Sequence, residues 1–225
     1  MVLNDKIILK MIAVNFKTYK EGTGYKAVEL ARICRKVQES TGVRIVVIPQ
    51  VADLRDCVET GVDCWVQHVD PVQPGKNTGW ITSEDVEQVG AKGTLLNHSE
   101  HRLDWEILKN TMEVISGRAF EGCICVKDLE EAVKCAELKP DFIAYEPPEL
   151  IGSREKSVSS ENPEMIKKIA EAIKIPILIG AGVHSAEDVK TGLSLGARGI
   201  LLATDIVLAG DPEKELQELA EAFGR

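Results

Sequence analysis

A regular alternation of short apolar runs with longer charged segments constrains the fold more than any other feature of this chain. The apolar runs are about four to six residues long. They are apolar nearly throughout, which is typical of parallel strands that are buried on both faces. They predict eight strands, over residues 11–15, 44–49, 64–68, 93–97, 122–126, 141–145, 175–179 and 199–202.

The segments between these runs carry helical periodicity. Between residues 24 and 40, apolar side chains recur at helical spacing, and Gly42 supplies a stop signal. The same reasoning predicts helices over residues 24–40, 52–60 (a short one), 128–136, 161–173, 185–195 and 211–223. Because no Pro-, Gly- or Ser-rich linker interrupts the alternation, we expect residues 1–225 to form a single domain.

Two architectures of the α/β class fit this pattern, an open doubly wound sheet and a closed (β/α)8 barrel. An open sheet that binds dinucleotides carries Gly-x-Gly-x-x-Gly after its first strand. This chain has Asn15-Phe16-Lys17 there. Eight repeats in 225 residues suit the barrel, so we predict a single-domain (β/α)8 TIM barrel.

Composition excludes several classes of function. Lys and Arg number 27 against 36 Asp and Glu, and the net charge of −9 argues against a nucleic-acid binder. No apolar run is long enough for a membrane span and no signal peptide is apparent, so we expect a cytoplasmic protein. Its six cysteines are then reduced, and we expect Cys123 and Cys125, inside a predicted strand, to be small buried side chains. No cluster of His, Cys and carboxylate residues has ligand spacing, so we expect no metal and no cofactor.

The candidate site residues follow the predicted strands, because barrel enzymes carry their active sites at the carboxyl ends of the strands. Lys17, His98 and Glu146 supply a cation, an electrophile and a base at these ends. Each alone has a structural explanation, but their convergence on one mouth favours catalysis. The loops after the last two strands offer backbone N–H groups to a phosphate. We expect the other histidines, His68, His184 and the helical His101, to be structural or exposed.

Several stretches resemble the triosephosphate isomerase family, in its shorter archaeal form, and the resemblance covers essentially the whole chain. Its most specific carriers are Asn97-His98-Ser99-Glu100 and Glu146-Pro147-Pro148-Glu149-Leu150-Ile151-Gly152. Val14-Asn15-Phe16-Lys17, Gln67-His68 and Gly180-Ala181-Gly182 support it in the same order along the chain.

The resemblance implies interconversion of dihydroxyacetone phosphate and D-glyceraldehyde 3-phosphate through an ene-diolate. It makes Glu146 the base, His98 the electrophile and Lys17 the cation that stabilises developing charge. Asn15 lies beside Lys17, and Glu100 supports the site from behind. The implied phosphate contacts, largely through backbone N–H groups, are Ile151, Gly152, Gly182, Ala203 and Thr204. We also expect residues 99–101 to begin a helix, whose N-terminus would keep His98 neutral.

The resemblance further implies a homo-oligomer. In the family, the loop at residues 70–79 reaches the active site of a neighbouring subunit through its threonine, here Thr78. The archaeal branch is typically tetrameric, so we predict a tetramer made of two dimers. Trp80, where that branch usually has histidine, bears on this packing.

The lid departs from the family pattern. Ser153-Arg154-Glu155-Lys156 follows Gly152, where the family commonly has Thr-Gly. An alternative is therefore a catalytically silent phosphate-binding barrel whose lid has drifted. A different phosphate-handling barrel enzyme would need a second carboxylate or a Schiff-base lysine inside the barrel, and no strand end offers one convincingly.

Overall fold

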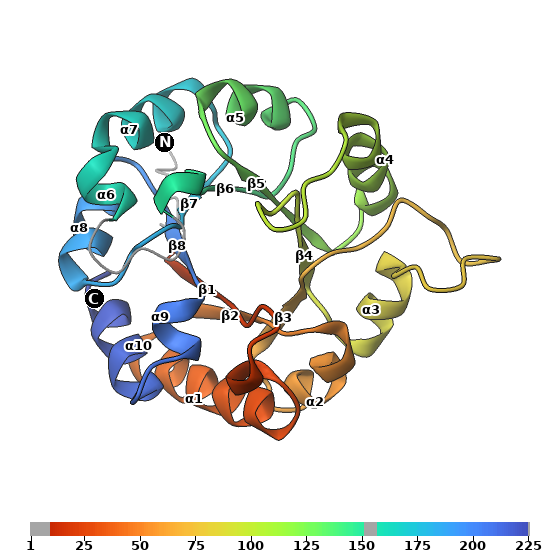
Figure 1. Ribbon diagram of the computed structural model, residues 1–225, viewed down its shortest axis with the longest axis horizontal. Helices are drawn as coiled ribbons and strands as arrows, with labels where there is room; N and C mark the ends of the chain where they lie inside the picture. Colours follow the sequence, from red (N-terminus) through yellow and green to blue (C-terminus); the bar gives the residue numbers. More distant parts are fainter. Residues whose placement is uncertain (1–9, 151–156, 225) are drawn as a thin grey trace, which may run out of the picture.

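The computed structural model describes residues 10–150 and 157–224, and in these residues the chain forms a closed barrel of eight parallel strands. Strand order follows the sequence, and the last strand pairs with the first (Figure 1). The strands are β1 (Met11–Asn15), β2 (Arg44–Ile48), β3 (Asp63–Val66), β4 (Gly93–Leu96), β5 (Glu121–Val126), β6 (Phe142–Tyr145), β7 (Ile177–Ile179) and β8 (Gly199–Leu202). The predicted (β/α)8 barrel is confirmed, and the open sheet is excluded.

Several strands are shorter than predicted at their carboxyl ends. The predictions ran to Pro49, His68 and Asn97, whereas β2, β3 and β4 stop before these residues. Proline has no N–H group for a ladder, and Asn97 has a φ of 60°, outside the extended region. Residues that follow the strands are therefore free to turn into the mouth of the barrel.

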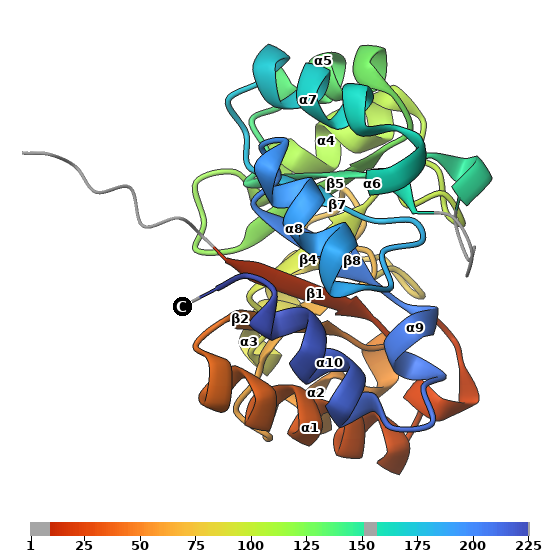
Figure 2. The same cartoon turned by 90° about the vertical axis from the view of Figure 1, so that its left-hand side faces the viewer.

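Helices surround the barrel on all sides (Figures 1 and 2). They are α1 (Tyr25–Thr41), α2 (Leu54–Val58), α3 (Ser83–Val89), α4 (Trp105–Ile115), α5 (Leu129–Ala136), α6 (Val158–Glu161), α7 (Pro163–Ala172), α8 (Ala186–Ser194), α9 (Thr204–Val207) and α10 (Pro212–Glu221). Three 3₁₀ turns complete the described elements: η1 (Lys20–Gly22), η2 (Val51–Asp53) and η3 (Pro148–Leu150). Sequence periodicity missed α3, α4, α6 and α9. Of the described helices, none combines the length and apolar character needed to cross a bilayer.

Polar caps set the starts of several helices one residue later than predicted. Asp128, Ser185 and Asp211 were predicted to be helical, but each precedes its helix and accepts a backbone N–H with its side chain. A capping side chain satisfies a donor that the first turn of a helix leaves without an intrahelical partner.

The core has two layers, because alternate residues of each strand point to opposite faces. The barrel interior holds Met11, Ala13, Val46, Ile48, Trp65, Leu95, Cys123, Cys125, Phe142, Ala144, Leu178 and Leu201. A larger apolar layer separates the outside of the strands from the helices. All six cysteines are buried and free, including Cys123 and Cys125, for which burial was predicted.

A charged network lies at the amino-terminal end of the barrel. Arg44 donates to both carboxylate oxygens of Glu121, at 2.8 and 2.7 Å, and to Asp63 at 2.9 Å. Trp65 Nε1 also donates to Glu121, at 3.0 Å. Arg44, Asp63 and Glu121 are each the first residue of a strand, so this pairing fills the end of the barrel opposite the candidate site.

Candidate active site

One pocket at the carboxyl ends of the strands brings the predicted site residues together. Loops after five different strands contribute to it. It is lined by Asn15, Lys17, His98, Glu146, Ala181, Gly182, Val183, Leu201, Leu202, Ala203, Thr204 and Asp205. Of the other predicted site residues, Glu100 lines the adjoining cavity. Ile151 and Gly152 lie outside the described residues, as does the lid departure at 153–156.

Glu146 follows β6 directly and is only 7% exposed. Its backbone N–H donates to the carbonyl of Val126 at 2.9 Å, which fixes the residue at the strand end. Among the residues that the structure describes, its Oε2 atom has no hydrogen-bond partner. A Cβ on Gly180 would lie 2.7 Å from the Cγ atom of Glu146 and 2.8 Å from Oε1, so only glycine leaves room for this carboxylate. A buried carboxylate oxygen without a partner is costly, and such groups are common at catalytic sites.

His98 faces this carboxylate, with Nε2 at 3.6 Å from Glu146 Oε2. On its other side, Nδ1 lies 3.2 Å from the backbone nitrogen of Glu100 and accepts its N–H. A ring nitrogen that accepts a hydrogen bond carries no proton, so the proton of the neutral ring lies on Nε2. His98 can therefore act as a neutral donor toward the pocket.

The helix predicted to begin at residues 99–101 is absent, so no helix N-terminus lies directly after His98. These residues form a turn, in which the N–H of His101 donates to the carbonyl of His98 at 2.8 Å. Asn97 stabilises the turn by accepting the N–H of Leu103 at 3.0 Å and donating to the carbonyl of Cys125 at 3.0 Å. Side-chain hydrogen bonds of this kind compete with helix formation, and α4 starts only at Trp105.

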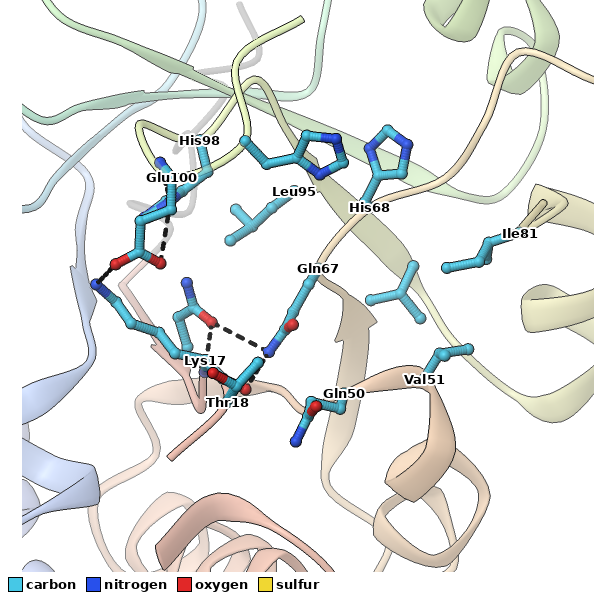
Figure 3. Close-up of a pocket in the computed structure, with 13 residues that line it drawn as sticks. Lys17, Thr18, Gln50, Val51, Gln67, His68, Ile81, Leu95, His98 and Glu100 are labelled. Atoms are coloured by element: carbon cyan, nitrogen blue, oxygen red, sulfur yellow. Dashed lines mark hydrogen bonds and ion pairs between the residues drawn. The ribbon is translucent and has the colours of Figure 1, made fainter. Parts of the chain in front are cut away.

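Lys17 is held at three points (Figure 3). Its backbone N–H donates to Asn15 Oδ1 at 2.9 Å, and its carbonyl accepts from Gln67 Nε2 at 2.8 Å. Its ammonium lies 2.7 Å from Glu100 Oε1. The backbone φ of Lys17 is 49°, in the left-handed region, which costs a non-glycine residue about 1–3 kcal/mol. The three contacts hold the lysine in this conformation at the mouth of the pocket.

Gln67 helps to hold Lys17 in place, although the sequence had suggested no role for it. It follows β3, and its amide also lies 3.3 Å from the carbonyl of Ile48. The sequence signals were its position after a strand and its place in the Gln67-His68 stretch that resembles the family. Neither signal gave it a role, because its partners come from the turn after β1 and from β2.

A second cavity, of about 310 Å³, adjoins the first on the side of β2 and β3. His68 and His101 line it with ring centroids 4.6 Å apart, and His68 Nε2 lies 3.1 Å from Asp70 Oδ1. Burial lowers the pKa of His68. His68 therefore has partners beside the site, as a structural histidine would, and His101 lies in a turn rather than in the predicted helix.

The other side of the pocket is formed by the loops after β7 and β8. Ala181 and Gly182 adopt left-handed conformations, with φ of 66° and 73°. Thr204 begins α9, and its hydroxyl lies 3.1 Å from the hydroxyl of Tyr19. His184, expected to be structural or exposed, contacts the carbonyl of Gly182. Across residues 10–150 and 157–224, no group of three or more His, Cys, Asp or Glu side chains is placed to hold a metal ion.

Comparison with known proteins agrees with this geometry. The sequence profile of the family described as triosephosphate isomerase matches residues 10–220. The triosephosphate isomerase of Methanothermus fervidus is 42% identical over 215 residues, which cover 93% of this chain and 96% of the relative. That of Methanocaldococcus jannaschii is 40% identical over 215 residues, covering 93% and 98%. That of Methanopyrus kandleri is 40% identical over 216 residues, covering 92% and 95%. The chain belongs to the triosephosphate isomerase family.

Proposed function

We propose that this chain interconverts dihydroxyacetone phosphate and D-glyceraldehyde 3-phosphate by proton transfer through an ene-diolate. Family membership supports the reaction class. The single observation that supports the assignment of roles is the unpartnered Oε2 of Glu146, which faces the protonated Nε2 of His98 across 3.6 Å. This pairing offers a base and a donor to adjacent atoms of one small substrate.

Glu146 is the proposed base. Removing a proton from a carbon next to a carbonyl leaves a carbanion, which becomes an ene-diolate when the negative charge moves to oxygen. Glu146 takes the proton from one carbon and returns it to the neighbouring carbon. The hydroxyl proton passes from one oxygen of the ene-diolate to the other, so the carbonyl and the hydroxyl exchange positions.

His98 and Lys17 are the proposed stabilisers of the oxygen charge. The Nε2–H of His98 donates to the oxygen on which charge develops, and the Lys17 ammonium adds a fixed positive charge in the same pocket. Glu100 contacts both groups: its carboxylate pairs with the Lys17 ammonium, and its backbone N–H donates to His98 Nδ1. It therefore fixes the position of Lys17 relative to His98. Asn15 keeps the backbone of Lys17 in place.

Backbone N–H groups are the proposed phosphate ligands. Gly182, Ala203 and Thr204 border the same pocket as Glu146 and supply the part of the subsite within the described residues. Ile151 and Gly152 are proposed from the resemblance alone.

A coupled assay with each triose phosphate in turn tests the proposal directly. We expect turnover in both directions without added cofactor. Absence of turnover, with retained binding of a triose phosphate, would instead identify a catalytically silent phosphate-binding barrel.

We also propose that the protein is a homo-oligomer built on a dimer. The loop between β3 and α3, gold in Figure 1, projects beyond the ring of helices. Thr78 is exposed on it, and Trp80 is 54% exposed. The cavity beside Lys17 and His98 is open to a partner's loop of this kind. Such a contact would bring Thr78 of one subunit to the site of the next.

Exposed apolar side chains on α4 and α5 support a tetramer of two dimers. Ile107 of α4 and Val133 of α5 are 39% and 44% exposed. These helices meet through Lys134, whose ammonium lies 4.2 Å from the ring centroid of Trp105. Sedimentation equilibrium at micromolar concentration should give about four times 24.6 kDa. A monomer would contradict both contacts.

We further propose that residues 1–225 are one domain that works in the cytoplasm. The unpaired state of all six buried cysteines supports a reducing compartment. Fractionation of the source cells would test this proposal, with recovery in the membrane or secreted fraction as the contradicting outcome.

A further inference from the structure

The buried carboxylate of Asp188 carries a network that the proposed reaction does not use. Asp188 lies in the first turn of α8, and its side chain is only 11% exposed. Its Oδ2 accepts from the hydroxyl of Ser185 at 2.6 Å and from the backbone N–H groups of Ser185 and His184 at 3.1 and 3.3 Å. Its Oδ1 accepts from the hydroxyl of Ser157.

Part of this network is ordinary helix capping. The Ser185 hydroxyl accepts the N–H of Asp188 while the Asp188 carboxylate accepts that of Ser185, which is a capping box. A capping box needs no third donor from elsewhere in the chain. The hydrogen bond from Ser157, which precedes α6, therefore calls for a separate explanation.

Two further contacts join the same pair of segments. The hydroxyl of Ser159 donates to the carbonyl of Asp188 at 2.9 Å. The N–H of Val158 donates to the carbonyl of Ala181 at 3.1 Å. The start of α6 is thus fastened to both ends of the loop at residues 180–185, and Figures 1 and 2 show α6 beside α8.

The backbone of the loop at residues 180–185 is strained at one residue and closely packed against the pocket at two others. Ala181 holds a left-handed φ of 66° although it has a Cβ atom. Gly180 lies against the carboxylate of Glu146, and Gly182 borders the same pocket. A small change in this loop would move the backbone at Gly182 relative to Glu146.

We propose that Asp188 is a positioning residue for the phosphate group of the substrate. It fixes His184 and Ser185 with one carboxylate oxygen and Ser157 with the other, so that the loop presents the Gly182 amide to the phosphate. Asp188 does not touch the substrate. This role rests on the proposed function, because it assumes that the pocket binds a triose phosphate.

The chemistry requires a carboxylate rather than an amide. Two acceptor oxygens serve four donors here, whereas asparagine offers one acceptor oxygen and an NH₂ group that would face donors. Removing a negative charge near the site would, by electrostatics alone, strengthen phosphate binding. Loss of positioning weakens it, so the two explanations predict opposite signs for Asp188→Asn.

Binding of glycerol 3-phosphate, measured by calorimetry on the intact protein, tests the sign. We expect Asp188→Asn to weaken binding by about tenfold or more. Asp85→Asn is the matched control, because Asp85 holds the same helical position after the capping Thr82 in α3, away from the pocket. It should bind like the wild type. Unchanged or tighter binding by Asp188→Asn would overturn the proposal.

Comparison of substrates separates positioning from general damage. Asp188→Asn should lower kcat/KM for D-glyceraldehyde 3-phosphate, with most of the loss in KM, and should lower the slow turnover of unphosphorylated glyceraldehyde far less. An equal loss on both substrates would overturn the role. Should Asp188→Asn fail to fold, Ser157→Ala removes the donor to Asp188 together with the Ser157 cap of α6. Ser160→Ala is its control, because Ser160 takes part in that capping box without a hydrogen bond to Asp188. Weaker binding by Ser157→Ala but not by Ser160→Ala supports positioning, and unchanged binding by Ser157→Ala overturns it.

These outcomes are distinct from failure of the proposed function. If the wild-type chain binds glycerol 3-phosphate but turns over neither triose phosphate, the isomerase assignment fails. The calorimetry then still tests whether Asp188 positions the loop for phosphate binding. If the wild type binds no glycerol 3-phosphate, both fail.

Discussion

His98 Nε2 lies 3.6 Å from Glu146 Oε2, beyond hydrogen-bonding distance, although the two side chains are only 9% and 8% exposed. Each residue has a contact that fixes it away from the other. His98 Nδ1 accepts the N–H of Glu100, and the backbone N–H of Glu146 donates to the carbonyl of Val126. The pair could relax into a direct contact only by giving up these supports. The separation therefore leaves the donor and the base free for a substrate.

Shortening the base should abolish most of the activity. Glu146→Asp withdraws the carboxylate by about one methylene, and displacements of this size cost on the order of 10²-fold or more in kcat. Steady-state kinetics with both triose phosphates measures the effect. Glu149→Asp is the matched control, because it shortens a glutamate in the same way on an exposed turn three residues further along the chain. A near-normal kcat for Glu146→Asp would rule out Glu146 as the base.

Replacing the electrophile should also lower kcat without unfolding the protein. His98→Gln removes the imidazole Nε2–H that is held toward the pocket, and loss of one such donor costs about 10²–10³-fold in kcat. Thermal unfolding should show a folded variant. If His98→Gln turned over at nearly the wild-type rate, another group would have to stabilise the oxygen charge.

Gln67 should act through Lys17. Gln67→Met removes the amide that donates to the Lys17 carbonyl, and we expect kcat/KM to fall at least several-fold because the ammonium is then less well placed. Gln50→Met is the control, because Gln50 lines the same cavity but donates to Thr23 instead. It should remain close to wild type.

The double variant distinguishes this route from a general loss of packing. In a Lys17→Ala background, Gln67→Met should cause little further loss of kcat/KM, since residues that act through one another are not additive. Additive losses would show that Gln67 acts independently of Lys17.

The buried thiols should be unreactive in the folded protein. Burial raises the pKa of every cysteine above the ordinary 9.0, that of Cys57 to about 12 and that of Cys135 to about 11. Because the thiolate is the reactive form, a thiol reagent at pH 8 should modify none of the six native cysteines and all six after denaturation. Fast modification of the native protein would contradict the burial.

The same shifts give a direction for stability. Below pH 9 the thiols are protonated in both states, so they do not change the balance. Above pH 9 the unfolded chain loses thiol protons that the folded chain retains, and the free energy of unfolding falls as pH rises. Chemical denaturation at pH 8 and pH 10 should therefore show lower stability at pH 10. A variant with Cys57→Ala should lose part of this dependence.

Activity should survive exhaustive chelation. The proposed steps use proton transfer and fixed charges alone, so dialysis against a strong chelator should leave kcat unchanged. Loss of activity that one divalent ion restores would overturn the mechanism.

The barrel and the gathering of Lys17, His98 and Glu146 at one end of it could be predicted from the sequence, because both depend on local signals. Each strand is a short apolar run, and Lys17, His98 and Glu146 each follow such a run. The predicted helix after His98 was wrong because the side chain of Asn97 closes a turn with Leu103, a choice that helical periodicity does not record. The contacts of Gln67 could not be predicted in the same way, because its partners come from β2 and from the turn after β1. Asp188 has local capping partners in His184 and Ser185 at the start of its own helix, but its contact with Ser157 appears only once the barrel is closed.

Solvent deuterium in the product tests the central claim most directly, that Glu146 carries a proton between neighbouring carbons. Dihydroxyacetone phosphate is incubated with the protein in D₂O, and the glyceraldehyde 3-phosphate formed is analysed by mass spectrometry and NMR. A base that exchanges its proton with solvent predicts deuterium at carbon 2 of the product, and Glu146→Gln should form almost no product. Product formed by the wild type with no deuterium at that carbon, or undiminished turnover by Glu146→Gln, would contradict the account.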